Sequence, residues 1–296
     1  MNRPNLLDLI AARAGHITRA LAATGKTIEF RDKEFRPTTG AIEDRSDAFL
    51  DLAANKATIW SAHGLALHHI FHILLHLHRY WVEGLPQLWD KDTGCVGMVH
   101  DIESAYEHLV IIPAEIAHFP DAYSYWVNYA EEGLYQCYEL ASAPKGPPND
   151  VSKDLKSKLF RLYLLAQAAF PRAQVATSIA EEAVKQGLLD EFSALADIVF
   201  KNFENKAFVV ETLCLYQADT LPARLGLRWV EAAPNGEGQQ FHWTLLKDYQ
   251  SVRTQPCTPV SSVPNSDARI SPAIQPESNS TSEPEILPDR AVWSAC

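Results

Sequence analysis

Residues 63–81 read HGLALHHIFHILLHLHRYW and hold six of the chain's eleven histidines. The apolar residues of this run predict an α-helix over residues 62–82. His68, His72 and His76 recur at a spacing of four, so they lie nearly in line along one face of that helix. Buried imidazole nitrogens cost free energy unless each has a partner, and one metal ion would satisfy several of them together. The alternative is a helix whose histidines bond to carboxylates and backbone carbonyls.

Two overlapping frames within this helix have the spacing of zinc ligands. In the motif H-E-x-x-H, histidines on consecutive turns bind zinc, and the glutamate activates the zinc-bound water. The frame from His68 to His72 reproduces both ligand positions, and His69 stands where the catalytic glutamate belongs. The frame from His72 to His76 has the same spacing, and the sequence alone does not choose between them.

A third zinc ligand is expected from a helix further along the chain. We predict a helix over residues 100–117. Pro113 is expected to kink this helix or to end its first part. Glu103 and Glu107 stand one turn apart on this helix, so both can face the same site.

Residues 60–115 resemble the zincin-like metallopeptidase domains of the IrrE-like group. In that group an H-E-x-x-H helix precedes a helix patterned Glu-Ala-Asn-x-Phe-Ala, followed by Leu-Leu-x-Pro. Here residues 103–105 read ESA and residues 109–113 read LVIIP, which is similar in order though not in detail. The resemblance covers less than a quarter of the chain. It implies a mixed fold with a small sheet beside the His-bearing helix.

The resemblance also implies a Zn²⁺ site. Its ligands would be His68, His72 and Glu103, with Glu107 or His108 as substitutes. The general base of a metallopeptidase is a carboxylate close to the metal-bound water. Because His69 occupies the glutamate position, the catalytic role falls to His69, or to Glu107 or Glu103 if that glutamate is not a ligand. We therefore predict a zincin-like metal-binding protein, which is a zinc-dependent peptidase acting on a peptide or protein if that role is filled.

Two further functions stay open. The missing glutamate also fits a catalytically inactive zincin-like module that binds and regulates a protein partner. A helical iron protein is the third hypothesis, because carboxylates and imidazoles both suit iron. Its ligands would come from Glu83, Glu103, Glu107, His72 and His76. The repeated Glu-x-x-His of di-iron bundles is absent, which ranks this hypothesis last.

Composition narrows the classes of protein. The formal net charge of −11 and the lack of clustered Lys and Arg argue against nucleic acid as a partner. The apolar runs are short and broken by His or charge, so we expect no membrane span. Five scattered cysteines without a C-x-x-C pair indicate neither a disulfide framework nor a Cys-based zinc site. A reducing cytoplasm is the expected location.

The chain divides by pattern into three parts. We predict an α+β, predominantly helical fold with a small sheet or hairpins, organised as a His-helix domain over residues 1–142, a helical domain ending in a β-hairpin over 143–250, and a disordered tail over 251–296. Further helices are expected at 5–23, 44–52, 121–140, 152–169, 172–185, 190–202 and 206–217. Two strands or a hairpin are expected at 27–36, and a loop at 88–96. A hairpin is expected around Asn235 and Gly236. Proline, Ser and Thr dominate the tail, which cannot bury enough surface to offset chain entropy.

Overall fold

A computed structural model of the chain describes residues 6–32, 48–52, 55–62, 64–90, 96–142, 152–218, 221–232 and 239–246. The helices in these ranges are α1 (Leu6–Ala23), α2 (Leu67–Trp81), α3 (Val96–His118), α4 (Ala122–Ser142), α5 (Lys153–Ala169), α6 (Gln174–Lys185), α7 (Leu189–Lys201) and α8 (Lys206–Ala218). The strands are β1 (Thr27–Asp32), β2 (Ala48–Leu52), β3 (Lys56–Ser61), β4 (Gln87–Asp90), β5 (Leu225–Ala232) and β6 (Gln239–Leu245). The fold is α+β and predominantly helical, as predicted. The tail predicted to be disordered lies outside the described residues.

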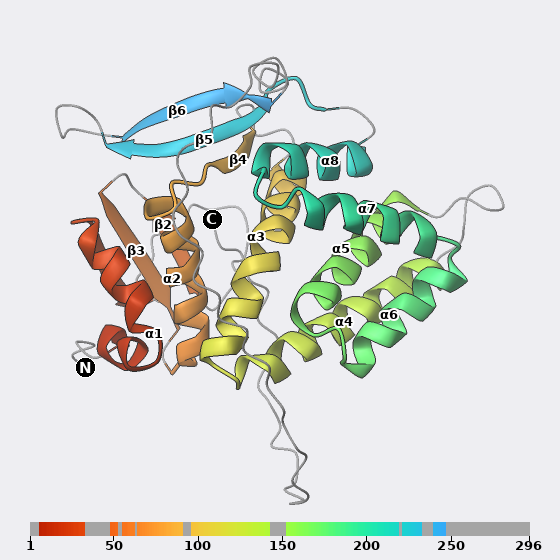
Figure 1. Cartoon of the computed structure of the whole chain (residues 1–296), viewed down its shortest axis with the longest axis horizontal. Helices are drawn as coiled ribbons and strands as arrows, with labels where there is room; N and C mark the ends of the chain where they lie inside the picture. The colour runs from red at the N-terminus through yellow and green to blue at the C-terminus, as the bar shows by residue number, and fades with distance from the viewer. Residues whose placement is uncertain are drawn as a thin grey trace, which may run out of the picture.

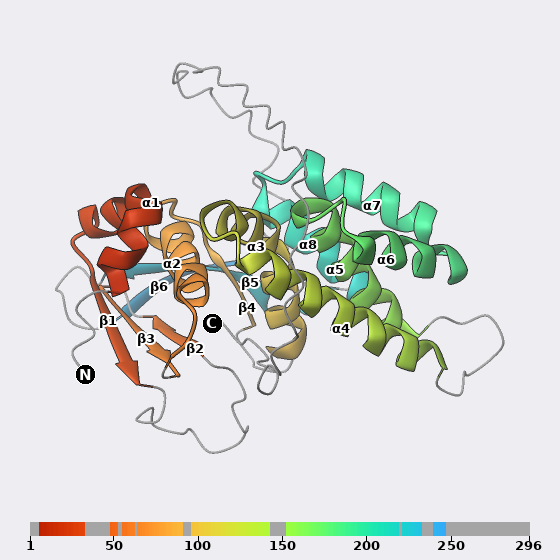
Figure 2. The same ribbon diagram turned by 90° about the horizontal axis from the view of Figure 1, so that it is seen from below.

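The first sheet has the strand order β1-β3-β2, with β3 parallel to β1 and antiparallel to β2. Helices α1 and α2 cover one of its faces (Figure 2). The prediction of a helix near Asp44–Leu52 is wrong for the described residues of this segment, because Ala48–Leu52 forms strand β2. Pairing with β3 satisfies the backbone of β2, and the side chain of Leu50 is buried in the core. Tertiary packing has therefore decided the structure of a segment too short to form a stable helix alone.

The second sheet has the strand order β4-β5-β6 and is antiparallel throughout. Strands β5 and β6 are the two arms of the predicted C-terminal hairpin, and their pairing is confirmed; the turn between them lies outside the described residues. Strand β4 occupies the start of the segment expected to be a loop. It follows α2 in the sequence and pairs with β5. The segment after the His-bearing helix is thereby joined to the C-terminal hairpin.

Helices α4 to α8 lie on the opposite side of α3 from α1 and α2 (Figure 1). Their bounds agree with the sequence prediction to within a few residues. Helix α3 continues through Pro113 to His118, although we expected a kink or an end there. Helices α3 and α4 both pack on α5, and the predicted domain boundary at residue 142 stays a prediction. Within the described residues, no helix combines the length and the apolar character needed to cross a bilayer.

Candidate metal centre

Helix α2 lies between the first sheet and α3, so nearly all of its residues are buried (Figure 1). The apolar side chains of α2 pack in the hydrophobic core. Four imidazoles are buried with them: His68, His69, His72 and His76. Buried imidazoles need hydrogen-bond or metal partners, and the partners come mainly from α3.

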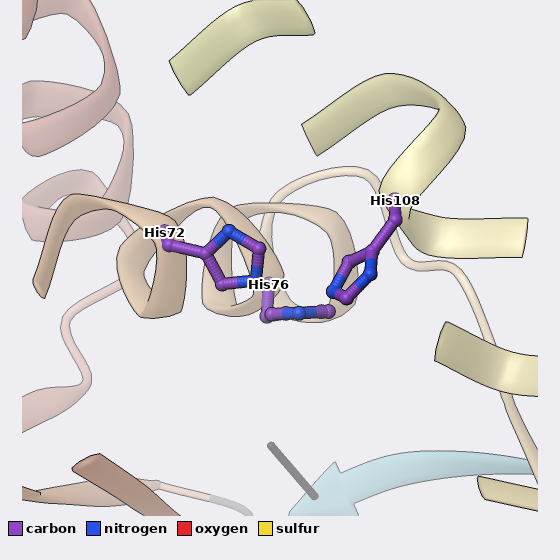
Figure 3. A group of neighbouring side chains, drawn as sticks. All are labelled: His72, His76 and His108. Carbon is purple, nitrogen blue, oxygen red and sulfur yellow. The ribbon is translucent and has the colours of Figure 1, made fainter. Parts of the chain in front are cut away.

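His72 and His76 from α2 meet His108 from α3. In Figure 3 the three rings turn toward one another across the gap between the two helices. One potential ligand nitrogen from each ring lies within 4.8 Å of the other two. In a tetrahedral zinc site the ligand nitrogens are roughly 3.3 Å apart, given Zn–N distances of about 2.0–2.1 Å. The three nitrogens would have to move closer together to bind one ion. With that movement, this cluster could hold a metal ion.

The surroundings of His76 and His108 favour the neutral form of these two rings. Burial lowers the pKa of His76 well below its ordinary value, and the positive charges of Arg79 and Lys206 lower it further. Burial also lowers the pKa of His108, with a further contribution from His72 and an opposing one from Glu115. At neutral pH both rings thus carry a free lone pair, which is the form of imidazole that binds metal.

A single buried carboxylate, Glu115 of α3, orients the histidines of α2. Its Oε1 lies 2.7 Å from His68 Nδ1, and its Oε2 lies 2.8 Å from His72 Nδ1. The indole Nε1–H of Trp126 in α4 donates to the same Oε2 at 3.0 Å. Burial alone would raise the pKa of Glu115, but the charge of His72 and the hydrogen bonds of both histidines hold it down at about 2. Glu115 is therefore a carboxylate that accepts all three bonds.

His68 and His72, which the sequence predicted as a pair of ligands, contact the same carboxylate from the next helix. That residue is Glu115 instead of Glu103. The ring of His69 lies against that of His68, with centroids 3.8 Å apart and the planes tilted by 41°, and it lies edge-on to Tyr125 at 4.6 Å. Burial, helped by the charge of His68, lowers the pKa of His69 to about 3. His69 is consequently neutral at pH 7 and a weak base.

Glu103 and Glu107, the predicted ligand and base, belong to a second cluster. Lys206 Nζ donates to Glu103 Oε1 and to Glu107 Oε1, at 2.6 Å in each case. Arg79 Nε donates to Glu107 Oε2, and Tyr80 OH to Glu103 Oε1 at 3.2 Å. Among the described residues, neither glutamate belongs to a group of potential ligand atoms that could hold a metal ion. The structure does not bring Glu103 together with His68 and His72.

Sequence reasoning missed Glu115 and Lys206. Glu115 stands seven residues after His108, which places both on one face of a continuous helix. Because Pro113 is expected to interrupt that helix, the sequence does not predict that Glu115 shares a face with His108. Lys206 begins α8, about a hundred residues from its partners, and no local pattern signals such a contact. His76 and His108 were named only as alternatives to the favoured ligand set.

Comparison with known proteins gives no relative for this chain: no family model matches it, and no significant match is found among curated proteins or solved structures.

Proposed function

We propose that this protein binds one transition-metal ion, Zn²⁺, through His72, His76 and His108. The observation that carries the proposal is the convergence of three largely buried imidazoles from two helices on one point. Three imidazoles with a fourth position left for another ligand are a common zinc environment.

The contact between Glu115 and His72 supports the proposal. A carboxylate that accepts from Nδ1–H fixes the tautomer, so the lone pair of His72 lies on Nε2. Metal-binding histidines almost always have such a carboxylate or carbonyl partner on the other ring nitrogen. Trp126 in turn holds Glu115, so the orientation of His72 is set by three helices.

His76 provides independent support. Both of its ring nitrogens are buried, and neither makes a hydrogen bond with the part of the chain that the structure describes. A buried polar atom left without a partner costs about 1–3 kcal/mol. Binding a metal would satisfy one of these nitrogens and account for a polar side chain deep in an apolar helix.

The contacts support metal binding better than peptidase activity. Glu107 is already bound by Arg79 and Lys206, and His69 is too weak a base to remove a proton efficiently near neutral pH. A zinc-dependent peptidase with His69 and Glu107 in the catalytic roles therefore has little geometric support. The imidazole ligands also suit iron. The visible absorption of the purified protein would distinguish the two metals, because bound iron is coloured and Zn²⁺ is colourless.

A second possible ligand set is His68, His72 and Glu115, because both imidazoles contact the carboxylate of Glu115. If the two rings moved apart, a metal between them would have the two histidines and one carboxylate of a zincin-like site. This set shares only His72 with the first one. Substitutions at His68 and at His76 therefore separate the two.

The experiment measures Zn²⁺ affinity of the tag-free protein by competition with a chelator dye. We expect one ion per chain, and a loss of roughly a hundredfold or more in affinity for His76→Gln and His108→Gln. Matched controls on the same helices, His78→Gln in α2 and His118→Gln in α3, should bind like the unmodified chain. A large loss in His68→Gln with none in His76→Gln would show that the zincin-like set is correct. Failure of the unmodified protein to bind would contradict the proposal.

A further inference from the structure

The three histidines of the candidate metal centre differ in what holds their rings. His72 contacts the carboxylate of Glu115, whereas neither ring nitrogen of His76 has a hydrogen-bond partner in the described part of the chain. The Nδ1 atom of His108 lies 3.2 Å from the hydroxyl oxygen of Ser104. Among the described residues, this is the one hydrogen bond that the His108 side chain makes. Ser104 is therefore the residue that can orient the ligand contributed by α3.

The contact between Ser104 and His108 follows from their spacing on α3. Residues four apart share a face of an α-helix, and the later side chain leans toward the N-terminus, over the earlier one. The ring of His108 also packs against other aromatic groups, with centroid distances of 4.9 Å to His72 and 5.5 Å to Trp126. Such ring contacts fix where the imidazole lies. A hydrogen bond at Nδ1 fixes in addition which of its two nitrogens faces which neighbour.

We propose that Ser104 is a positioning residue of the metal centre: its hydroxyl holds Nδ1 of His108, so that Nε2 is presented to the ion. The inference rests on the proposed metal site and deepens it. A metal-bound imidazole almost always keeps its other N–H in a hydrogen bond, and this partner orients the ring. Because the ring is already held when the ion arrives, less conformational freedom is lost on binding. Ser104 thus does for His108 what Glu115 does for His72.

The test compares Ser104→Ala with Ser104→Thr, which keeps the hydroxyl, in the tag-free full-length protein. Zn²⁺ affinity is measured by competition with a chelator dye. We expect Ser104→Ala to bind Zn²⁺ on the order of tenfold more weakly, and Ser104→Thr to bind like the unmodified chain. The visible absorption of bound Co²⁺ reports on the arrangement of the ligands. It should change in Ser104→Ala and stay the same in Ser104→Thr.

The matched control is Ser193→Ala, which removes a hydroxyl that lies 3.2 Å from the hydroxyl of Tyr163, between α5 and α7. Urea denaturation of the metal-free variants compares the cost to the fold. Ser193→Ala should leave Zn²⁺ affinity and the Co²⁺ spectrum unchanged. An equal loss of affinity in both alanine variants would overturn the inference, because both would then act through the stability of the fold.

The inference and the metal site on which it rests can fail separately. If the unmodified protein binds Zn²⁺ through the three histidines and Ser104→Ala binds it equally well, the inference is overturned while the metal site stands. Equal losses in Ser104→Ala and Ser104→Thr would also overturn it, because the hydroxyl would then play no part. If the unmodified protein does not bind Zn²⁺, both proposals fail together.

Discussion

At the scale of single residues, the site is organised by Glu115, which contacts histidines on two turns of α2. It does not need to bind the metal to matter, because it sets which nitrogen of His72 faces the centre. We expect Glu115→Gln to lower Zn²⁺ affinity by roughly 10–100-fold, the usual effect of losing an outer carboxylate partner. Competition titrations would measure this affinity. The matched control is Glu139→Gln, which changes an exposed glutamate of α4. An unchanged affinity would mean that the carboxylate of Glu115 does not support metal binding by His72.

Lys206 is the corresponding residue of the second cluster. It is buried and binds two buried glutamates, so its removal leaves negative charge without compensation. We expect Lys206→Met to lower the free energy of unfolding by about 3–5 kcal/mol, as measured by urea denaturation. In the control Lys201→Met, a surface ion pair with the exposed Asp197 is lost, which costs at most about 1 kcal/mol. Similar losses in the two variants would show that the buried cluster adds nothing special.

Among the elements, the helices were predictable and three of the strands, β2, β3 and β4, were not; the sequence predicted no element at Lys56–Ser61, which forms β3. Helical periodicity is local, so α1 and α4 to α8 could be located from apolar spacing alone. We predicted a helix where β2 lies and part of a loop where β4 lies. A short strand is stabilised by hydrogen bonds to a partner strand, so its own residues do not identify it. Neither β3 for β2 nor β5 for β4 can be identified by reading the short segment itself.

The candidate site was predictable to a similar extent. The repeat of four placed His68, His72 and His76 on one face, and the structure confirms that these residues share a helix. The partner residues on α3 could not be ranked, because that depends on how α3 is rotated against α2. The passage of α3 through Pro113 brings Glu115 into the site, and standard helix-breaking rules argue against such a continuation.

The packing of α4 on α5 can be tested at Gly133. A Cβ atom at this position would lie 2.9 Å from the Leu162 side chain, and Leu162 is itself buried. We expect Gly133→Val to lower the free energy of unfolding by about 1–3 kcal/mol through overpacking. The control Gly97→Ala in α3, where a Cβ meets nothing within 4 Å, should be neutral or stabilising by up to about 1 kcal/mol. If Gly133→Val unfolded at the same denaturant concentration as the unmodified chain, the two helices would not pack as described.

At the scale of the whole molecule, the metal would join the part of the chain that contains α2 to the part organised around α3. Helix α3 in turn contacts α5 and α8, and strand β4 follows α2 into the second sheet. A ligand that binds only the folded state stabilises it by about 2.7 kcal/mol at a hundred times its Kd. We therefore expect Zn²⁺ to raise the melting temperature of the unmodified protein and of His78→Gln, but not of His76→Gln. A rise of equal size in all three would indicate binding elsewhere.

Anomalous diffraction at the zinc edge would show whether His72, His76 and His108 share one metal ion. In crystals of the zinc-loaded protein we expect one strong peak between α2 and α3, with the three imidazole nitrogens about 2.0–2.1 Å away. A peak between His68, His72 and Glu115 would contradict this assignment of the ligands. So would a fully occupied zinc site elsewhere in the protein with no peak beside α2.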